Sequence, residues 1–461
     1  MQFRYRLWTP REVYDRNYSE TRLPIVPSAI LETMSHQSFN DMRHGLDPNF
    51  RCTLARSIYK TLLRFITNQH KEHGVVQPLQ PENFHIEFTK KEGEVRLSWQ
   101  GIIEDQEPSS APTGYVLYMA EDDGGYDNGT HLRGSSCNVR LMPNVLYRFR
   151  VTATNDGGES FPTEELTALY NPVAQHTVLV VNGFNRLSSP AISAEGQGFD
   201  MMADAGVSYG RTAGWLGIQR VFDEKRLGVV DSTGLGFSTN ELEGRFVAGN
   251  TFDYVRTHAE AIRHAGAYSI VSSSAEAVEN GDIDLTKFKA MDIIMGLQCN
   301  DGHSLRSYKT FSPALQAQLR KYTRGGGNIM VSGAFIGSDM QQPEEKTFLE
   351  ETMKVVCYGK NSDKENTIKG MGTSFNFFRE LNEKHYAAPH TDVLMPATPV
   401  GGDSPNQAFP AMVYANETSA AVAYQGKVYK SFTMGFPFEC ITDSGKRQSI
   451  MRAILIFLLT K

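Results

Sequence analysis

His176-Thr-Val-Leu-Val-Val-Asn182 is a run of mostly apolar residues that leads directly into Gly183. Apolar side chains at successive positions place both faces of such a strand in a core, as happens in parallel sheets. Three further short runs have the same character: 268–272, 291–297 and 328–332. The sequence therefore predicts a parallel sheet within residues 174–461.

Helical patterns separate these apolar runs. Residues 254–265 have helical periodicity, and residues 312–323 begin with a serine at the N-cap followed by a proline. Two elements close the segment: a strand with a turn over 426–439 and a helix over 447–459. Strands that alternate with helices favour an α/β domain over residues 174–461.

Residues 83–170 have a different pattern, in which apolar and polar residues alternate as in half-buried strands. The clearest stretches are 95–99, 114–118 and 147–153, and clusters of Gly, Asp and Asn separate them. Together they predict an all-β domain.

This all-β segment resembles a fibronectin type III domain over nearly its whole length. Trp99 stands at the position of the core tryptophan, and Leu141 precedes Tyr147 by six residues, as in the late strands of that family. The resemblance implies a two-sheet sandwich without an obvious pocket, which serves as a spacer or a binding module.

The α/β segment resembles the class I glutamine-amidotransferase-like, or flavodoxin-like, fold. The passage from Gly325 to Ala334 resembles the nucleophile elbow of that family, and Gly435-Phe-Pro-Phe-Glu439 resembles the ending of several members without amidotransferase activity. Ser332 stands where amidotransferases carry their nucleophilic cysteine, and their His-x-Glu pair is absent. We therefore do not expect glutaminase chemistry.

Near the N-terminus, the pattern predicts a short strand over Ser28–Leu31 that ends at the carboxylate of Glu32, followed by a polar loop containing His36. A helical pattern then begins at Asp47. Its apolar face consists of Leu54, Ile58, Leu62, Phe65 and Ile66. A carboxylate at the C-terminal end of a strand is a common place for a catalytic acid or base in α/β folds.

Residues 1–68 resemble the C-terminal end of zinc-dependent N-acetylmuramoyl-L-alanine amidases of type 3, and Glu32 falls on that family's catalytic glutamate. The resemblance implies a zinc cofactor whose ligands, two His and a Glu, lie upstream of this region. It therefore places no zinc ligand within this chain. His36 would line the same cleft or lie in an exposed loop.

The predicted organisation is thus multidomain: a partial amidase-like α/β segment (1–68), a polar linker with two prolines (69–82), a fibronectin III sandwich (83–170) and a flavodoxin-like α/β domain (174–461). This order of domains resembles bacterial envelope proteins labelled putative xanthan lyase. It implies a periplasmic, extracellular or cell-envelope location.

Composition narrows the classes of function. The chain has 461 residues and a net charge of −6, which does not indicate a general affinity for nucleic acid or anionic membranes. No apolar run approaches the roughly 20 residues of a transmembrane helix. Residues after Met1 lack the apolar core of a secretory signal peptide. Five scattered cysteines without CxxC spacing indicate free thiols.

Ser332 is a candidate nucleophile because a serine beside Gly333, at a sharp turn from strand to helix, can be exposed next to backbone N–H donors. The full Gly-x-Ser-x-Gly motif is missing, since Met330 precedes it by two residues. A tight turn that needs small residues explains the same pattern.

Polar residues follow three of the predicted strands. They are Cys299, Asp301 and His303 after one strand, Asn182 and Arg186 after another, Asp339 after a third, and Glu439 near the end of the chain. The carboxyl ends of parallel strands meet at one edge of a sheet, so these residues predict a crevice for a sugar or a carboxylate. A Cys/His pair, a metal site or an ordinary polar loop would have the same spacing at 299–303.

The leading hypothesis is an envelope protein of the peptidoglycan-amidase type, which binds peptidoglycan or another cell-surface glycan. Glu32 would act as the proton shuttle of amide hydrolysis. The alternatives are a non-catalytic glycan-binding or scaffold protein, a polysaccharide-active enzyme of the putative xanthan lyase type, and a serine hydrolase centred on Ser332.

Overall fold

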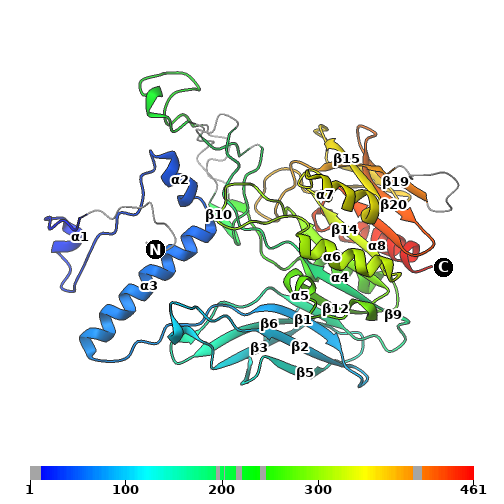
Figure 1. Cartoon of the computed structure of the whole chain (residues 1–461), viewed down its shortest axis with the longest axis horizontal. Coiled ribbons are helices and arrows are strands. Elements are labelled where there is room, and N and C mark those ends of the chain that lie inside the picture. Colours follow the sequence, from blue (N-terminus) through cyan, green and yellow to red (C-terminus); the bar gives the residue numbers. More distant parts are fainter. Residues whose placement is uncertain are drawn as a thin grey trace.

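The computed structural model of the chain describes residues 12–193, 198–201, 203–213, 221–238, 246–397 and 407–460. A long helix near the N-terminus, a β-sandwich and a mixed sheet with helices follow one another along the sequence. In Figure 1 the sandwich lies beneath the mixed sheet, and the long helix α3 lies beside both.

The sandwich is built from eight strands: β1 (Glu82–Phe88), β2 (Glu94–Gln100), β3 (Gly114–Glu121), β4 (Thr130–Leu132), β5 (Ser136–Arg140), β6 (Leu146–Asn155), β7 (Gly158–Glu159) and β8 (Leu166–Leu169). One sheet joins β1, β2 and β5, and the other joins β4, β3, β6 and β8, all antiparallel. The predicted all-β region is confirmed.

Aromatic residues fill the core of the sandwich. Trp99 is buried between Phe84 and Tyr115, at centroid distances of 6.4 Å and 5.5 Å. The Tyr147 hydroxyl accepts a hydrogen bond from the backbone N–H of Met142 at 3.2 Å, which fixes the corner between the two sheets.

The second domain contains the mixed sheet. Its parallel strands lie in the order β12 (Tyr268–Ser274), β9 (His176–Asn182), β13 (Ala290–Gly296), β14 (Asn328–Gly333) and β21 (Lys430–Met434). Antiparallel strands β20 (Ser419–Gln425), β19 (Gln407–Tyr414), β16 (Thr367–Gly370) and β17 (Thr373–Asn376) extend it beyond β21. The sequence patterns predicted a parallel sheet from four of these strands and a further strand within 426–439, but not the antiparallel extension.

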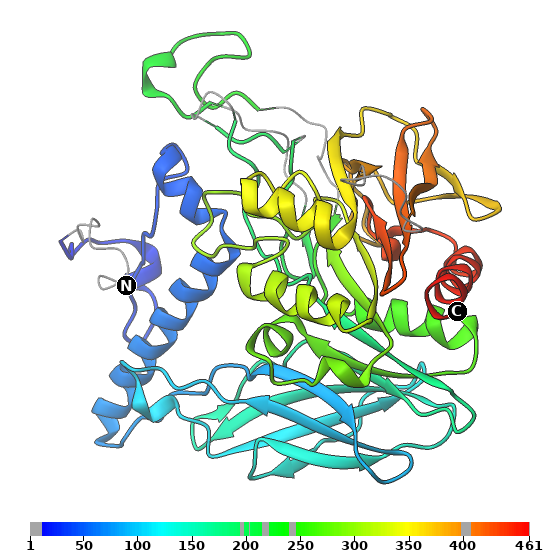
Figure 2. The same ribbon diagram turned by 45° about the vertical axis from the view of Figure 1, so that its right-hand side comes forward.

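Helices cover the sheet. Helix α4 (Tyr254–Ala265) packs against α8 (Ser444–Leu459), and α5 (Ala275–Asn280) packs against α6 (Pro313–Arg324). Figure 2 shows the two pairs on opposite sides of the parallel strands. Shorter pieces of this domain include α7 (Pro343–Phe348), the two-stranded pairs β10 (Arg211–Ala213) with β11 (Phe246–Ala248) and β15 (Val355–Lys360) with β18 (Asp392–Pro396), and a 3-10 turn at Phe438–Cys440.

The sandwich covers the free edge of β12. Strand β12 forms one residue pair with β8 and one with β1. Side chains add further contacts between the two domains: the Ser272 hydroxyl accepts a hydrogen bond from the N–H of Thr167 at 2.7 Å and donates one to the Thr167 carbonyl at 2.8 Å. Ser269 accepts in the same way from the N–H of Asn171 at 3.0 Å. Serine side chains thus replace part of the backbone ladder.

Ion pairs and a shared core strengthen this join. Arg150 of the sandwich contacts Asp253 at 2.7 Å, and Arg263 of α4 contacts Asp122 at 2.6 Å. Buried residues of both domains belong to one continuous hydrophobic cluster. The sandwich is therefore packed firmly against the α/β domain and is not a flexible spacer.

Helix α3 (Pro48–His70) connects the N-terminal region to both domains. At its N-terminus, the buried N-cap Asp47 accepts from the N–H of Leu305 at 3.0 Å, and Asn49 donates to the carbonyl of Leu187 at 2.8 Å. These contacts attach the helix to loops of the α/β domain. The predicted helix after Asp47 is confirmed.

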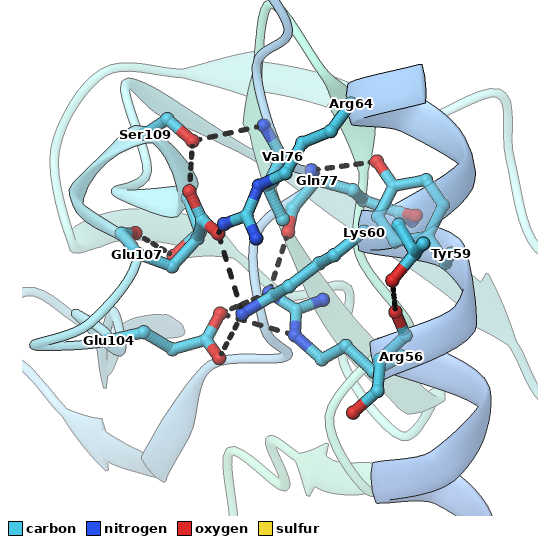
Figure 3. Close-up of polar contacts among 12 residues, drawn as sticks. Arg56, Tyr59, Lys60, Arg64, Val76, Gln77, Glu104, Glu107 and Ser109 are labelled. Atoms are coloured by element: carbon cyan, nitrogen blue, oxygen red, sulfur yellow. Dashed lines mark hydrogen bonds and ion pairs between the residues drawn. The ribbon is translucent and has the colours of Figure 1, made fainter. Parts of the chain in front are cut away.

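Further along α3, basic residues contact the sandwich. Figure 3 shows Arg56, Lys60 and Arg64 reaching toward Glu104 and Glu107, with Lys60 3.1 Å from Glu104 and Arg64 2.6 Å from Glu107. Burial alone would raise the pKa of Glu104, but hydrogen bonds from Arg56 and Lys60 outweigh burial and lower it. The helix therefore braces the two domains through charged contacts.

The segment predicted as a linker, 69–82, packs against helix α3 and the sandwich. Its first residues belong to α3, and Val76 is 2% exposed. The carbonyl of Val76 accepts a hydrogen bond from the Asn155 side chain at 2.9 Å. The N–H of Gln77 donates to the Tyr59 hydroxyl at 3.1 Å. A polar composition with two prolines is compatible with an extended segment held by side chains.

The predicted strand Ser28–Leu31 is wrong. These residues form neither helix nor strand and are exposed, with Leu31 at 61%. An isolated strand has no stable backbone partners in water, and no described strand pairs with this one. In the sequence this segment lies between two short helices, α1 (Ser19–Arg22) and α2 (Phe39–Gly45), of which α2 packs Phe39 against Phe199 and Phe222.

We expect Ser272→Ala to destabilise the protein by about 1–3 kcal/mol, because a buried N–H and a buried carbonyl of Thr167 each lose a hydrogen bond. Ser273→Ala is the matched control, since the equally buried Ser273 hydroxyl donates only to its neighbour's carbonyl. Urea unfolding of both variants measures the difference. Equal stability losses would contradict a special role for the join.

Candidate functional site

A cavity of about 420 Å³ lies at the carboxyl ends of the parallel strands. Loops after β9, β13 and β14 form its walls. The chain crosses from β9 to β12 on one side and continues from β13 to β14 on the other, so the strand order reverses here. Open α/β sheets bind ligands at such a reversal.

Four residues predicted from the sequence line this cavity: Cys299, Asp301, His303 and Asp339. The other lining residues that bear charge are Asp204, Lys360 and Arg43, which comes from helix α2. The site therefore combines contributions from the α/β domain and the N-terminal segment.

Asp301 and His303 stabilise the loop that carries them. Asp301 accepts from the Ser304 hydroxyl at 2.6 Å and from the N–H of His303 at 3.1 Å. Burial alone would raise the pKa of Asp301. The hydrogen bonds outweigh burial, so the pKa of Asp301 is lowered. His303 Nε2 lies 2.9 Å from the Ser189 hydroxyl, which ties this loop to the segment after β9.

Asp339 and Asp204 also make structural contacts. Asp339 accepts from the backbone N–H of Thr310 at 2.8 Å and of Asn300 at 3.2 Å. Asp204 forms an ion pair with Arg186, which is fully buried and donates to the carbonyl of Leu297 at 3.0 Å. Arg186 therefore supports the wall of the cavity from behind, without lining it.

The cavity has no activated sulfur nucleophile. Burial raises the pKa of the Cys299 thiol to about 12, despite the charge of Arg186 nearby. The ring nitrogens of His303 lie beside the Ser189 hydroxyl and the carbonyls of Asp301 and Pro190, and these contacts leave no base directed at Cys299 among the described residues. A protonated thiol without a base does not attack substrates at neutral pH.

The predicted exposed nucleophile Ser332 is wrong. Ser332 lies inside β14 and is fully buried, and its hydroxyl has no hydrogen-bond partner among the described residues. The strand continues to Gly333, so the sharp turn begins later, at Ala334. Asn182, at the end of β9, is likewise buried and does not line the cavity.

Glu439 lies apart from the crevice, in a buried network. His258 of α4 contacts Asp292 of β13 at 2.7 Å through Nδ1 and Glu439 at 3.2 Å through Nε2. The Tyr386 hydroxyl donates to the other oxygen of Glu439 at 2.6 Å. All four residues are buried.

Attraction between opposite charges shifts the pKa values of groups in this network. Burial alone would lower the pKa of His258, but Asp292 and Glu439 outweigh it and raise the pKa to about 9. Burial alone would raise the pKa of Glu439, but hydrogen bonds and charge from His258 lower it. An imidazolium between two carboxylates therefore ties the helix, the sheet and the turn at Glu439 together.

Sequence reasoning missed this network although signals were present. Asp292 interrupts an otherwise apolar strand, and a buried carboxylate needs a partner. His258 follows the buried Tyr254 by four residues and precedes the buried Ile262 by four, on the inner face of α4. Lys360 and Arg43 gave no comparable signal, because only the fold brings them to the cavity.

The zinc site implied by the amidase resemblance does not fit the described residues. Among them, no group of three or more His, Cys, Asp or Glu is placed to hold a metal ion. Glu32 and His36 are both exposed on the N-terminal segment. We therefore derive no chemistry through zinc for this chain. In the described part of the chain, no helix is long and apolar enough to cross a membrane.

The comparisons identify one part of the chain. The family model of the fibronectin type III domain matches residues 79–168. The chain is therefore multidomain, with a fibronectin III sandwich and a mixed sheet with helices. No curated protein matches this chain.

Three solved structures are similar over a short part of the chain. One titled "Myokine structure" is 19% identical, with a TM-score of 0.18, over 21% of this chain and 99% of that one. The twitchin kinase region from C. elegans is 20% identical, with a TM-score of 0.19, over 28% of this chain and 24% of that one. The "Structure of FN3tt mut" is 20% identical, with a TM-score of 0.17, over 20% of this chain and 94% of that one.

The buried network predicts how stability depends on pH. The raised pKa of His258 adds stability that is fully present below its unfolded value of 6.5 and is lost as pH rises through about 9. The lowered pKa of Glu439 adds stability above its unfolded value of 4.5, which is lost at lower pH. We therefore expect wild-type stability to fall between about pH 6.5 and pH 9.

His258→Gln should cost about 3–5 kcal/mol, because two buried carboxylates lose their cation, and should flatten this alkaline decline. His264→Gln, an exposed site on the same helix, is the control. Urea unfolding across the pH range measures both. A wild-type protein equally stable at both ends of the range would contradict the assignment.

Proposed function

We propose that this chain is a non-catalytic glycan-binding protein of the bacterial envelope and that its α/β domain binds a saccharide in the crevice beside β13 and β14. The observation that carries the proposal is the lining of that cavity, which combines carboxylates, a serine, an imidazole and two cations around about 420 Å³. Such a mixture of donors and acceptors suits the hydroxyl groups of a sugar.

The strand order supports the flavodoxin-like assignment. Numbered along the domain, β12–β9–β13–β14–β21 is the order 2-1-3-4-5, which is the flavodoxin-like order. The envelope location and the glycan partner rest on the resemblance of the domain order to envelope proteins, and fibronectin III domains occur in extracellular proteins.

Binding is favoured over catalysis because the groups that could react are occupied or protected. Asp301, Asp339 and Asp204 hold loops or Arg186. The Cys299 thiol is protonated and Ser332 is buried. Arg43 and Lys360, in contrast, have no recorded ion pair in the described part of the chain, and they line the cavity.

We expect Lys360→Ala and Arg43→Ala each to weaken binding of soluble peptidoglycan fragments by roughly threefold to tenfold, because one good polar contact contributes about 1 kcal/mol. Lys364→Ala, an exposed lysine in the following loop, should bind as wild type does. Isothermal titration calorimetry measures the affinities, and neutral glucan oligosaccharides test selectivity. Absence of binding by either glycan would refute the proposal.

A second candidate is the amidase activity that the stretch around Glu32 implies. The observation that favours it is the exposure of Ile25, Val26, Ile30 and Leu31, which is the state expected of a strand without its sheet. In this proposal Glu32 acts as the proton shuttle of amide hydrolysis.

Zinc content separates the two candidates. We expect the chain, stripped with chelator and reloaded, to retain well under one zinc per molecule, because the described residues offer no ligand cluster. Elemental analysis gives the ratio. One tightly held zinc, together with cell-wall hydrolysis that Glu32→Gln abolishes, would favour the amidase over the binding protein.

A further inference from the structure

A smaller cavity, which we call the inner pocket, adjoins the crevice beside β13 and β14. It has a volume of about 30 Å³ and shares Ala203, Asp204 and Phe335 with the crevice. A cavity needs roughly 10–15 Å³ to admit one water-sized group. The inner pocket therefore has room for a small substituent of a ligand that occupies the crevice, and not for a second sugar ring.

Apolar side chains form most of the wall of the inner pocket. They include Ala205, Val207, Val247, Ala248, Leu297 and Leu381. The polar side chains on the wall are Asp204, His390 and Tyr386, and the Tyr386 hydroxyl already donates to Glu439 at 2.6 Å. An apolar substituent therefore finds van der Waals contacts over most of the wall.

Backbone donors of the wall also have partners within the protein. The N–H of Val207 donates to the carbonyl of Ser188 at 2.9 Å, and the N–H of Ala248 donates to the carbonyl of Asn382 at 2.8 Å. A buried water molecule needs two to four polar partners. Because the wall has few polar groups left to offer, it suits a methyl group better than a water molecule.

The wall of the inner pocket is formed in the absence of a ligand. Gly206 has a φ of 73°, and a Cβ atom at this position would lie 2.6 Å from the carbonyl oxygen of Ser188. Val207 and Ser188 exchange both backbone hydrogen bonds, at 2.8 Å and 2.9 Å. A ligand therefore does not have to order this turn when it binds.

Asp204 lies where the crevice and the inner pocket meet. Its carboxylate pairs with Arg186 and accepts from the N–H of Gly206 at 3.0 Å, and its side chain is 18% exposed. A carboxylate has about four acceptor positions, so it can accept a further hydrogen bond from a ligand. An acceptor thus stands beside an apolar pocket of methyl size.

We propose that the crevice and the inner pocket together select a saccharide that carries an acetamido group. The methyl group fills the inner pocket, and Asp204 accepts a hydrogen bond from the amide N–H. A hydroxyl in place of the acetamido group leaves the pocket without an apolar occupant. The inference rests on the proposed glycan-binding function and adds the substituent that the site recognises.

The first test compares three sugars by calorimetry or NMR titration of the full chain. We expect N-acetyl-D-glucosamine to bind about tenfold more tightly than D-glucose, because it buries a methyl group and adds one hydrogen bond. N-butanoyl-D-glucosamine should bind severalfold more weakly than the acetyl sugar, since its chain exceeds the pocket. Tighter binding of the butanoyl sugar would overturn the inference, because an open apolar surface would then hold the chain.

The second test fills the inner pocket. Ala248→Val adds two methyl groups to its wall and should remove the preference for the acetyl sugar over glucose. Ala408→Val makes the same change in strand β19, lines neither cavity and should keep the preference. If Ala248→Val does not fold, Ala205→Val fills the pocket from another part of the wall. A preference that survives in a folded filled variant would refute the pocket.

The outcomes separate this inference from the proposed function. Equal binding of glucose and N-acetyl-D-glucosamine, with peptidoglycan fragments still bound through Lys360, would overturn only the acetamido pocket. Absence of binding by all of these sugars and fragments would overturn both the glycan-binding function and the pocket.

Discussion

The edge of strand β12 is the constraint on which the rest of the structure depends. An uncovered edge strand exposes a row of backbone N–H and C=O groups and invites aggregation. In this chain the fibronectin III sandwich covers that edge, with Ser272 and Ser269 taking the place of backbone partners. Because a serine hydroxyl both donates and accepts, one side chain satisfies two backbone groups of the neighbouring strand.

The covered edge also matters for helix α3, because the sandwich that covers it is one of the two domains that α3 contacts. Once the sandwich is fixed, helix α3 can contact it through Glu104 and Glu107 while its N-terminus stays attached to the α/β domain through Asp47. Figure 3 shows the charged half of this brace. Helix α2 packs against α3 and brings Arg43 to the crevice. The candidate site thus depends on three parts of the chain.

The sequence predicted most elements and fewer of their roles. The apolar runs at 176–182 and 291–297 became β9 and β13 because buried parallel strands require that composition, and 254–265 became α4. The run at 28–31 has similar composition but no partner strand in the described residues, so composition alone was insufficient. Periodicity describes what a segment can form, and tertiary partners decide whether it does.

The same limit explains the candidate site. Sequence order placed Cys299, Asp301, His303 and Asp339 at one sheet edge, because parallel strands end together. Sequence order did not reveal whether those side chains were free to contact a ligand or already hydrogen-bonded within the protein. Asp301 and Asp339 accept hydrogen bonds from nearby loop residues, so their carboxylates already have partners and mainly stabilise the walls of the cavity.

A buried charge network differs from a catalytic one in its access to solvent. Asp292, His258 and Glu439 have residue types and distances that would suit a proton relay, yet each is at most 1% exposed. A relay needs a substrate atom at one end, and here both imidazole nitrogens are occupied by carboxylates. The attraction between one imidazolium and two carboxylates offsets part of the cost of burying three ionisable groups in the core.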